Sequence, residues 1–218
     1  MPAIQNVEAF LLAGGKSSRM GRDKALLEFS GAPMIQHTAD ILTGIVIKTT
    51  LVISASQSGN SDNPNDTNRY SNFGLPTLVD SWPSFGPLGG IATALANAQS
   101  KWCLILACDM PFLSKEWLTF LIDRSVQSET NAPLKIDAIV PETKRGLEAL
   151  CAIYRASCAP ILATALNRGV RKVTDAISVL NLHRIAEIEW RQFSPDGNLF
   201  GNLNTWQDYL EAQQHLKS

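Results

Sequence analysis

The residues with the clearest chemical potential in this chain lie near its N-terminus. An apolar run at positions 7–13 predicts a short buried strand, and it ends at Gly14 and Gly15. Four basic residues follow within nine positions: Lys16, Arg19, Arg22 and Lys24. Paired glycines after a strand let backbone N–H groups approach an anion closely, and the basic side chains can neutralise more than one phosphate group. The pattern therefore predicts a binding site for a nucleoside triphosphate.

Two other phosphate-binding motifs do not fit this segment. Gly15-Lys16-Ser17 resembles the end of a P-loop, but G-x-x-x-x-G-K-[ST] requires glycine at position 10, where the chain has Phe10. No G-x-G-x-x-G follows a strand either, so the dinucleotide fingerprint is absent. A solvated basic turn that binds nothing remains the alternative.

Two aspartates follow predicted strands and could face the phosphates. Asp109 comes after the apolar residues 104–108, and Asp80 comes after Thr77-Leu78-Val79. Magnesium takes one or two protein carboxylates together with water and phosphate oxygens, so Asp109 is predicted to bind Mg²⁺. Asp80 is predicted to contact the nucleotide or to lie near the metal. The alternatives are structural: Asp109 could form the turn before Pro111, and Asp80 could cap the turn that follows it.

A second group of oxygen donors lies near the C-terminus, in Gly201-Asn202-Leu203-Asn204-Thr205. The amide oxygens of Asn202 and Asn204 could join the same site. However, Thr205 with Asp208 three residues later resembles a helix capping box, in which Asn204 would be only a turn residue. We favour a functional role for Asn202 and leave both roles open for Asn204.

The composition limits the class of protein. The 218 residues suffice for one α/β domain with a real core, since 45% of them are hydrophobic. The net charge of -1 gives no basic field that would attract nucleic acid. No apolar run approaches the roughly 20 residues of a membrane span, and no secretory signal is recognisable. We therefore expect no nucleic-acid partner and no membrane partner.

Metal or disulfide chemistry at the cysteines is not expected. Cys103, Cys108, Cys151 and Cys158 form no C-x-x-C pair, and the three histidines are scattered. We interpret the cysteines as small core residues whose free thiols suit a reducing cytoplasm.

The order of elements predicts the fold class. Strand and helix patterns alternate, which favours an α/β fold with a Rossmann-like, doubly wound and mostly parallel sheet and helices on both faces. Strands are expected at 7–13, 49–54, 77–79, 102–107, 137–140, 147–154 and 184–190, and helices at 33–42, 87–98, 115–124, 157–166, 172–180 and from 205 onward. Residues 57–72 are polar and predict a surface loop. Ligands of such folds bind beyond the carboxyl ends of the strands, where the glycines, Asp80 and Asp109 would lie.

Several motifs, met in order along the chain, resemble those of one enzyme family. Leu12-Ala13-Gly14-Gly15, Ser18-Arg19-Met20-Gly21 and Lys24 are similar to the N-terminal signature of nucleotidyltransferases that act on sugar phosphates. Four further motifs resemble the molybdenum cofactor guanylyltransferase branch, which is MobA-like: Leu78-Val79-Asp80, the run at 86–91, the run at 107–112 and Asn202-Leu203-Asn204-Thr205. The resemblance spans almost the whole chain.

The resemblance implies a fold like that of the nucleotide-diphospho-sugar transferases, with GTP bound together with Mg²⁺. It implies catalytic roles for Lys24, Arg19 and Asp109, with Asp109 on the metal. Substrate-binding roles are implied for Leu12, Ala13, Gly14, Gly15, Lys24, Ser54, Asp80, Asp109 and Asn202. Where this chain has Ser54, the family often has an asparagine that contacts the nucleotide. The hydroxyl of Ser54 can still donate a hydrogen bond there. The expected arrangement is a single domain, 1–218, with a nucleotide-binding part at about 1–125 and a molybdopterin-binding part at about 126–218.

The implied reaction is transfer of GMP from GTP to molybdenum-loaded molybdopterin, with molybdoenzymes or their chaperones as later partners. The alternatives are a molybdopterin cytidylyltransferase, another small-substrate nucleotidyltransferase of this fold, and a catalytically silent nucleotide-binding protein. Leu12-Ala13-Gly14-Gly15-Lys16 differs from the Ala-Ala-Gly-Arg start of cytidylyl relatives. In addition, Gly14, Gly15, Gly89 and Gly90 are expected to leave room for a purine. A second basic cluster at 168–172 either meets the cofactor's phosphate or is simply solvated.

Overall fold

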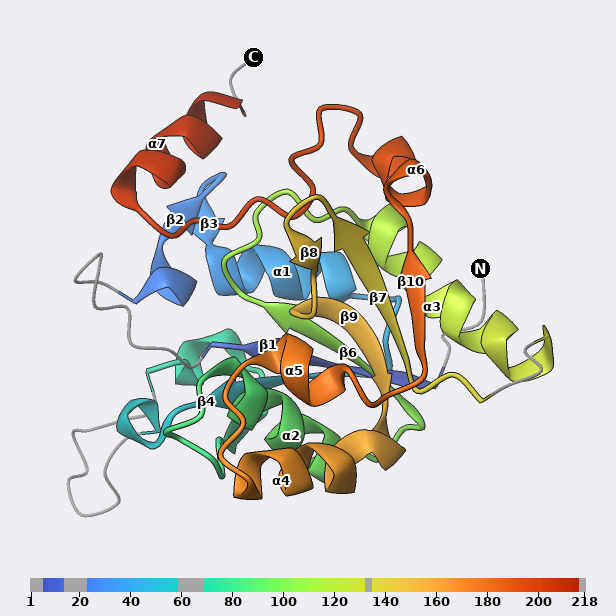
Figure 1. Cartoon of the computed structure of the whole chain (residues 1–218). Coiled ribbons are helices and arrows are strands. Elements are labelled where there is room, and N and C mark those ends of the chain that lie inside the picture. Colours follow the sequence, from blue (N-terminus) through green and yellow to red (C-terminus); the bar gives the residue numbers. More distant parts are fainter. Residues whose placement is uncertain (1–5, 14–22, 59–68, 132–134, 216–218) are drawn as a thin grey trace.

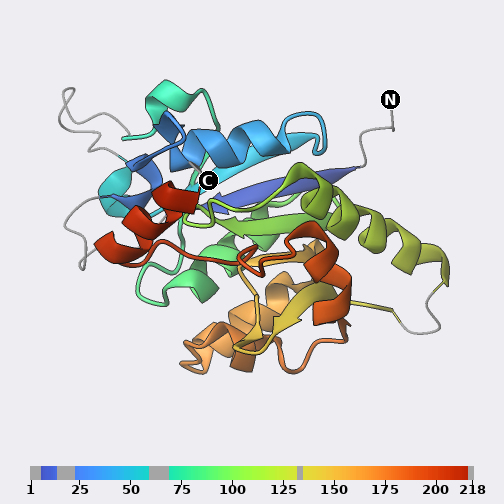
Figure 2. The ribbon, with the colours of Figure 1, turned by 90° about the horizontal axis from the view of Figure 1, so that it is seen from above.

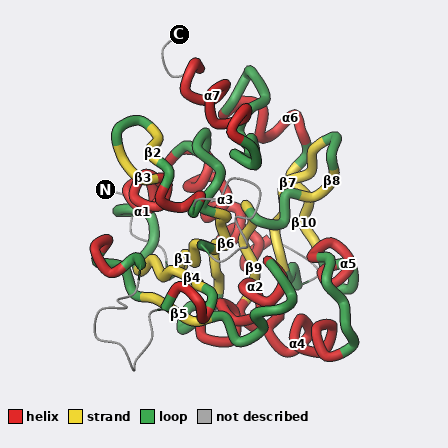
Figure 3. The backbone as a smooth tube through the Cα atoms, turned by 90° about the vertical axis from the view of Figure 1, so that its left-hand side faces the viewer, coloured by secondary structure: helices red, strands yellow, loops and turns green. Residues whose placement is uncertain are grey.

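The computed structural model describes residues 6–13, 23–58, 69–131 and 135–215. Eight strands in these ranges form one sheet, seven of them in the order β10-β7-β9-β6-β1-β4-β5, with β8 paired to β7 (Figure 1). Figure 3 shows this succession from β5, β4 and β1 at the left to β7 and β10 at the right. The strands are β1 (Val7–Leu12), β4 (Lys48–Ile53), β5 (Thr77–Val79), β6 (Trp102–Ala107), β7 (Ala138–Thr143), β8 (Gly146–Leu147), β9 (Cys151–Arg155) and β10 (Leu182–Ile185).

The four strands β6, β1, β4 and β5 are parallel neighbours. From β1 the chain moves outward through β4 to β5, and it then returns to place β6 on the other side of β1. The strand order therefore reverses at β1, which is the point where open α/β sheets bind ligands. Beyond β6, the strand β9 is antiparallel to both of its neighbours, while β7 and β10 are parallel to each other. The predicted α/β class with a mostly parallel sheet is confirmed.

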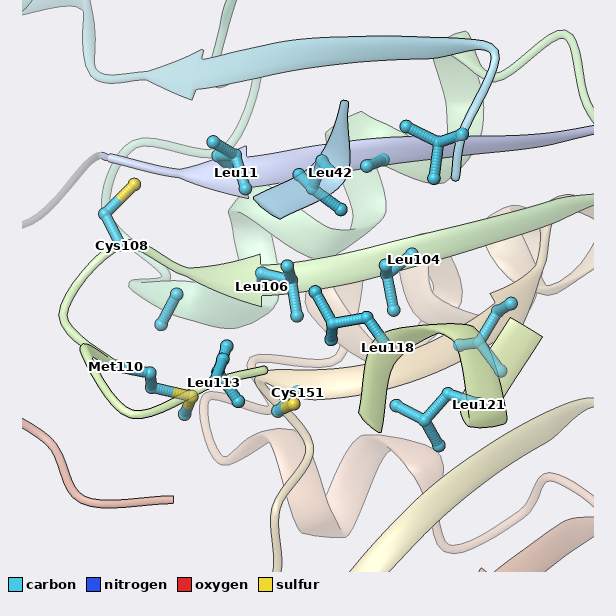
Figure 4. Close-up of a cluster of buried hydrophobic side chains, with 14 of the residues drawn as sticks. Leu11, Leu42, Leu104, Leu106, Cys108, Met110, Leu113, Leu118, Leu121 and Cys151 are labelled. Carbon is cyan, nitrogen blue, oxygen red and sulfur yellow. The ribbon is translucent and has the colours of Figure 1, made fainter. Parts of the chain in front are cut away.

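Helices cover both faces of the sheet (Figure 2). One face carries α1 (Met34–Leu42) and α3 (Lys115–Asn131), and the other carries α2 (Pro87–Asn97), α4 (Ala159–Asn167) and α5 (Val173–Ile177). The central strands are apolar on both faces because successive side chains point to opposite sides. Leu11 thus packs in the core under α1 and α3, while its neighbour Phe10 packs in the core under α2. In Figure 4, Leu104 and Leu106 of β6 lie beside Leu118 and Leu121 of α3.

The four cysteines are core residues, as the sequence predicts. All are buried and free of disulfides. Burial, above all, raises the pKa of the Cys103 and Cys151 thiols to about 12 and that of Cys158 to about 11. They stay protonated at neutral pH and offer no reactive thiolate.

A small outlying cluster joins the C-terminal helix to an early hairpin. The strands β2 (Glu28–Phe29) and β3 (Ala32–Pro33) are antiparallel, with a turn at Ser30 and Gly31 between them. The helix α7 (Trp206–His215) packs against them through Tyr209, whose hydroxyl donates a hydrogen bond to the carbonyl of Glu28 over 2.7 Å. No helix in the described part of the chain is long and apolar enough to span a membrane.

Some element predictions are wrong in type or in bounds. The strand expected at 184–190 ends at Ile185, and residues 187–190 form α6 (Glu187–Trp190). The carboxylate of Glu189 accepts the backbone N–H of Ala186 over 3.2 Å and so favours a helical start, while Ile188 is 85% exposed and supports no strand. The extended stretch expected at 147–154 is broken into β8 and β9, and the helix expected at 115–124 continues to Asn131.

Candidate active site

Four strands deliver side chains to one edge of the sheet. Ala13 follows β1, Ser54 follows β4, Asp80 follows β5 and Asp109 lies two residues beyond β6. The strands are parallel and in register, with Leu12 opposite both Val52 of β4 and Ala107 of β6. Their carboxyl ends therefore coincide, and the structure places the predicted residues that it describes at this edge.

Lys24 is the centre of the polar contacts at this edge. Its Nζ atom lies 3.2 Å from Oδ2 of Asp109 and 2.7 Å from Oδ1 of Asn204. The three residues are up to 180 positions apart in the sequence. The side chains of Lys24 and Asp109 are each about a fifth exposed, at 22% and 21%, so a ligand can reach both of them.

A short 3-10 turn holds Lys24 in place. This turn, η1 (Lys24–Leu26), begins after Asp23, whose Oδ1 atom accepts the backbone N–H of Ala25 over 3.2 Å. Such capping satisfies a donor that the turn itself cannot bond. The position of Lys24 thus depends on the carboxylate that precedes it.

Asn204 makes one contact with its side chain and another with its backbone, while a functional role of its amide oxygen stays a prediction. Its side chain contacts Lys24, and its backbone N–H donates to Oδ2 of Asp208 over 2.8 Å. Thr205 and Asp208 also form the predicted capping box, because Asp208 accepts the N–H of Thr205 while the Thr205 hydroxyl accepts the N–H of Asp208. The cap therefore fixes the backbone from which Asn204 reaches Lys24.

Asn202 carries an oxygen that no described residue satisfies. Its Oδ1 atom is buried and has no hydrogen-bond partner among the described residues. The next residue, Leu203, donates its backbone N–H to the carbonyl of Asp109 over 3.0 Å, so this segment runs beside Asp109. Native proteins seldom leave a buried polar atom unsatisfied, and ligand-binding sites are among the exceptions.

The donor set at this edge fits a magnesium ion. Asp109 offers a partly exposed carboxylate, and Asn202 offers an unsatisfied amide oxygen from the segment in which Leu203 bonds the backbone carbonyl of Asp109. Mg²⁺ prefers hard oxygen ligands, accepts few from the protein and completes its shell with water and phosphate oxygens. The residues present are therefore of the kind that such an ion would use.

Asp80 has a structural role at one of its two oxygens. Its Oδ1 atom accepts the backbone N–H of Trp82 over 2.8 Å and the Thr93 hydroxyl over 2.9 Å, so it caps the turn that follows, as the structural alternative expected. The other oxygen, Oδ2, faces Gly89 at the start of α2. A contact between this oxygen and a nucleotide stays a prediction.

The glycines of α2 do not leave space for a base. A Cβ atom at Gly89 would lie 2.5 Å from the carbonyl of Trp82, and one at Gly90 would lie 3.3 Å from the side chain of Leu12. These two residues are small because α2 packs closely on its neighbours. The expectation that Gly89 and Gly90 make room for a purine is therefore wrong, because the space beside them is filled by the protein itself.

The remaining predicted residues divide into two groups. Leu12 is half-buried against Gly90, and Ala13 continues the β1 pairing through its N–H to the carbonyl of Val52. Gly14, Gly15 and Arg19 lie outside the described residues, so their roles stay predictions.

Ser54 turns its hydroxyl toward neighbours in its own segment. The oxygen lies 2.9 Å from Oγ of Ser56 and donates to Oε1 of Gln57 over 2.9 Å. A hydrogen bond from Ser54 to a nucleotide would have to replace one of these contacts.

Two residues near the site have no counterpart in the sequence prediction. Gln57 and Tyr70 are 7% and 0% exposed and bond to Ala13 and Asp23. They lie within segment 57–72, which the sequence predicts to be a polar surface loop, so that prediction is wrong for these two residues. A tyrosine in an otherwise polar stretch was the one available signal, since a buried Tyr usually brings its hydroxyl to a partner.

The second basic cluster lies next to the turn before α2. Arg171 donates from Nη1 to the carbonyl of Ser84 over 2.7 Å, and its guanidinium lies 5.2 Å from the ring centre of Phe85. Arg168 and Lys172 are exposed. A contact of this cluster with a cofactor's phosphate stays a prediction.

Comparison with known proteins identifies the family. A family model for the MobA-like NTP transferase domain matches residues 9–183. The chain belongs to this family. Proteins described as probable molybdenum cofactor guanylyltransferases from Peptoclostridium acidaminophilum and Trichormus variabilis are each 32% identical to it. These alignments cover 94% and 96% of this chain and 88% and 92% of the relatives, respectively. The family resemblance seen in the motifs is confirmed, and the protein is a nucleotidyltransferase.

Solved structures share the fold. The molybdopterin-guanine dinucleotide biosynthesis protein A of Archaeoglobus fulgidus superimposes with a TM-score of 0.78 at 24% identity, covering 96% of this chain and 98% of that one. A CMP:2-keto-3-deoxy-manno-octonic acid synthetase in complex with CTP gives a TM-score of 0.66 at 11% identity, covering 98% and 99%. At these identities the likeness shows the α/β nucleotidyltransferase fold alone.

Proposed function

We propose that this protein transfers GMP from GTP to the terminal phosphate of molybdenum-loaded molybdopterin and releases pyrophosphate. The observation that carries the proposal is the Lys24 ammonium, held between Asp109 and Asn204 at the switch point of the sheet. The ammonium lies beside a carboxylate and an amide oxygen, and sheets of this kind bind nucleotides at this edge. The names of the similar proteins supply the choice of guanine and of molybdopterin.

The chemistry proposed for the site is mainly electrostatic. A phosphate monoester is already largely anionic near neutral pH, so it can attack the α-phosphorus without a general base. The difficulty is to bring two polyanions together, and Lys24 with Arg19 would offset their repulsion and follow the charge onto the departing pyrophosphate. The three N–H groups of the Lys24 ammonium can turn from protein oxygens to phosphate oxygens as the ligand enters.

Mg²⁺ is the proposed cofactor, held by Asp109 with Asn202 as a second oxygen donor. When bound, it would act as a Lewis acid on the phosphate oxygens. Asp109 also holds the Lys24 ammonium, so it orients the protein's own cation at the same edge.

The other proposed contacts follow the predicted order of the site. Leu12, Ala13, Gly14 and Gly15 would hold the guanine and ribose, with Ser54 and Asp80 contacting the nucleotide from the neighbouring strands. Molybdopterin would bind mainly to residues of the second part of the chain, 126–218. Molybdoenzymes or their chaperones are the proposed later partners, and the four free buried thiols support a cytoplasmic location.

Release of pyrophosphate tests the proposal. The protein is incubated with GTP and Mg²⁺, with and without molybdopterin, and pyrophosphate is measured. We expect release only when molybdopterin is present. Binding of GTP without any release would favour the catalytically silent nucleotide-binding protein, and would overturn the proposal.

A further inference from the structure

Four residues form a hydrogen-bonded network behind the site. Gln57 donates from Nε2 to the carbonyl of Ala13 over 3.2 Å and to the hydroxyl of Tyr70 over 2.7 Å. Tyr70 donates in turn to Oδ2 of Asp23 over 2.7 Å, and the same oxygen lies 3.3 Å from Nε2 of Gln57. Ala13 and Asp23 stand on either side of segment 14–22 in the sequence, and Gln57 and Tyr70 stand at the ends of segment 58–69. We call this set the Gln57–Tyr70 network.

The direction of each hydrogen bond in the network is determined by its neighbours. The backbone N–H of Ser54 can only donate, and it lies 2.9 Å from Oε1 of Gln57. The amide nitrogen of Gln57 must therefore face the carbonyl of Ala13, which can only accept. Burial, together with the adjacent Asp23 carboxylate, raises the pKa of Tyr70, so this hydroxyl keeps its proton and donates it to Asp23.

Within the network, Gln57 and Tyr70 hold the Asp23 carboxylate, and Asp23 caps the turn that carries Lys24. The side chain of Asp23 is only 8% exposed. Its Oδ2 atom accepts from Tyr70 and Gln57 and lies 3.4 Å from Nη1 of Arg69, which leaves Oδ1 directed at the N–H of Ala25 in the turn that carries Lys24. If the network were broken, this carboxylate would rotate or take up water, and the turn would lose its cap.

We propose that Tyr70 and Gln57 are positioning residues for nucleotide binding, which act through Asp23 to hold Lys24 at the phosphate site. The inference rests on the proposed function, because it assigns to Lys24 a role on the nucleotide. The hydrogen bonds described above join these two residues to each other, to Ala13 and to Asp23. Their effect is to fix the turn from which Lys24 reaches Asp109 and Asn204.

A double-mutant cycle tests the proposal. The affinity for GTP with Mg²⁺ is measured by calorimetry for the wild type, Tyr70→Phe, Lys24→Ala and the double variant. Tyr70→Phe removes one buried hydroxyl and should weaken GTP binding about tenfold, the factor expected when a hydrogen bond to a charged group is lost. In the Lys24→Ala background the same change should weaken binding less than twofold, because the residue through which Tyr70 acts is gone.

Tyr154→Phe is the matched control. Tyr154 is also fully buried, and its hydroxyl donates one hydrogen bond, to the carbonyl of Ala149 over 2.8 Å. It lies in the core under α2, outside the Gln57–Tyr70 network. This variant should lower the melting temperature but leave the affinity for GTP unchanged.

The outcomes separate this inference from the proposed function. Wild-type protein that binds no GTP would contradict the proposed function, and the cycle would then be run with whichever nucleoside triphosphate binds. Normal affinity in Tyr70→Phe, or the same loss in both backgrounds, would overturn the inference and leave the proposed function standing. If Tyr70→Phe fails to fold, Gln57→Leu takes its place in the same cycle. This substitution breaks the network and keeps the tyrosine itself unchanged.

Discussion

Lys24 joins parts of the chain that the sequence separates widely. Its ammonium contacts a carboxylate that follows β6 and an amide oxygen from the segment before α7. An ammonium carries three N–H donors, so these two contacts leave a third that can reach a phosphate oxygen. The ion pair with Asp109 is partly exposed and contributes little to stability by itself. The role of this ion pair is to orient the Lys24 ammonium and the Asp109 carboxylate relative to each other.

Replacement of Asp109 by asparagine tests the role of its charge. Asp109→Asn keeps the shape of the side chain and removes the carboxylate that orients Lys24 and is proposed to bind Mg²⁺. Turnover should fall by roughly two orders of magnitude or more, several kcal/mol in the barrier. The fold should survive, because the side chain is partly exposed at the end of a strand. Steady-state kinetics and circular dichroism measure the two effects, and near-full activity at ordinary magnesium would refute the assignment.

Replacement of Lys24 by alanine tests whether the ammonium acts in the transition state. If its charge follows the phosphate oxygens as pyrophosphate departs, Lys24→Ala should lower kcat and kcat/KM together. The measurement is the dependence of the initial rate on GTP concentration. A higher KM with unchanged kcat would instead show that Lys24 contributes equally to ground-state and transition-state binding.

At the scale of elements, the start of α7 links stability to the site. Hydrogen bonds from the backbone N–H of Thr205, above all, and from that of Asn204 hold the pKa of Asp208 below its ordinary value. A carboxyl whose pKa is lowered by folding stabilises the protein at pH above its unfolded pKa. That contribution is lost as the pH falls through the lowered pKa.

Asp208→Asn should therefore destabilise the protein by about 1 kcal/mol at neutral pH, the usual effect of losing a helix cap. The difference in stability between the variant and the wild type should shrink below about pH 4. In that range the Asp208 carboxylate of the wild type becomes protonated and loses its charge. Thermal unfolding from pH 7 to pH 2 measures this. Glu211→Gln is the control, because this carboxylate lies on the same helix and bonds only the Gln207 side chain among the described residues. A gap that stays constant down to pH 2 would contradict the assignment.

The elements that the sequence predicts well are those with a local cause. The strand β6 has the predicted bounds of 102–107, because it lies in a run of apolar residues that ends at the turn around Asp109. The prediction of a strand at 184–190 is wrong because its last residues form a helix. That helix is stabilised by the cap from Glu189 and by the packing of Trp190. The Gln57–Tyr70 network could not be predicted, because its hydrogen bonds join residues up to 47 positions apart.

At the scale of the whole molecule, the topology of the sheet brings the candidate residues together. The strands β6, β1, β4 and β5 are parallel neighbours, so the sheet aligns their carboxyl ends at one edge. Strand-end positions for Asp80 and Asp109 could be predicted on that basis. The contact between Lys24 and Asn204 could not, because it depends on where α7 packs on the hairpin of β2 and β3. Close packing of α2 also explains why glycine occupies positions 89 and 90, which the sequence alone suggested were open to a ligand.

Turnover of molybdopterin with GTP, CTP and ATP side by side tests the proposed choice of GTP most directly. Guanine presents an O6 acceptor and N1–H and N2–H donors on one edge. A site that satisfies these groups leaves buried partners unpaired when cytosine enters. We expect kcat/KM for GTP to exceed that for CTP by more than about 100-fold, near 3 kcal/mol. Equal or better use of CTP would contradict the account and assign the protein to cytidylyl transfer.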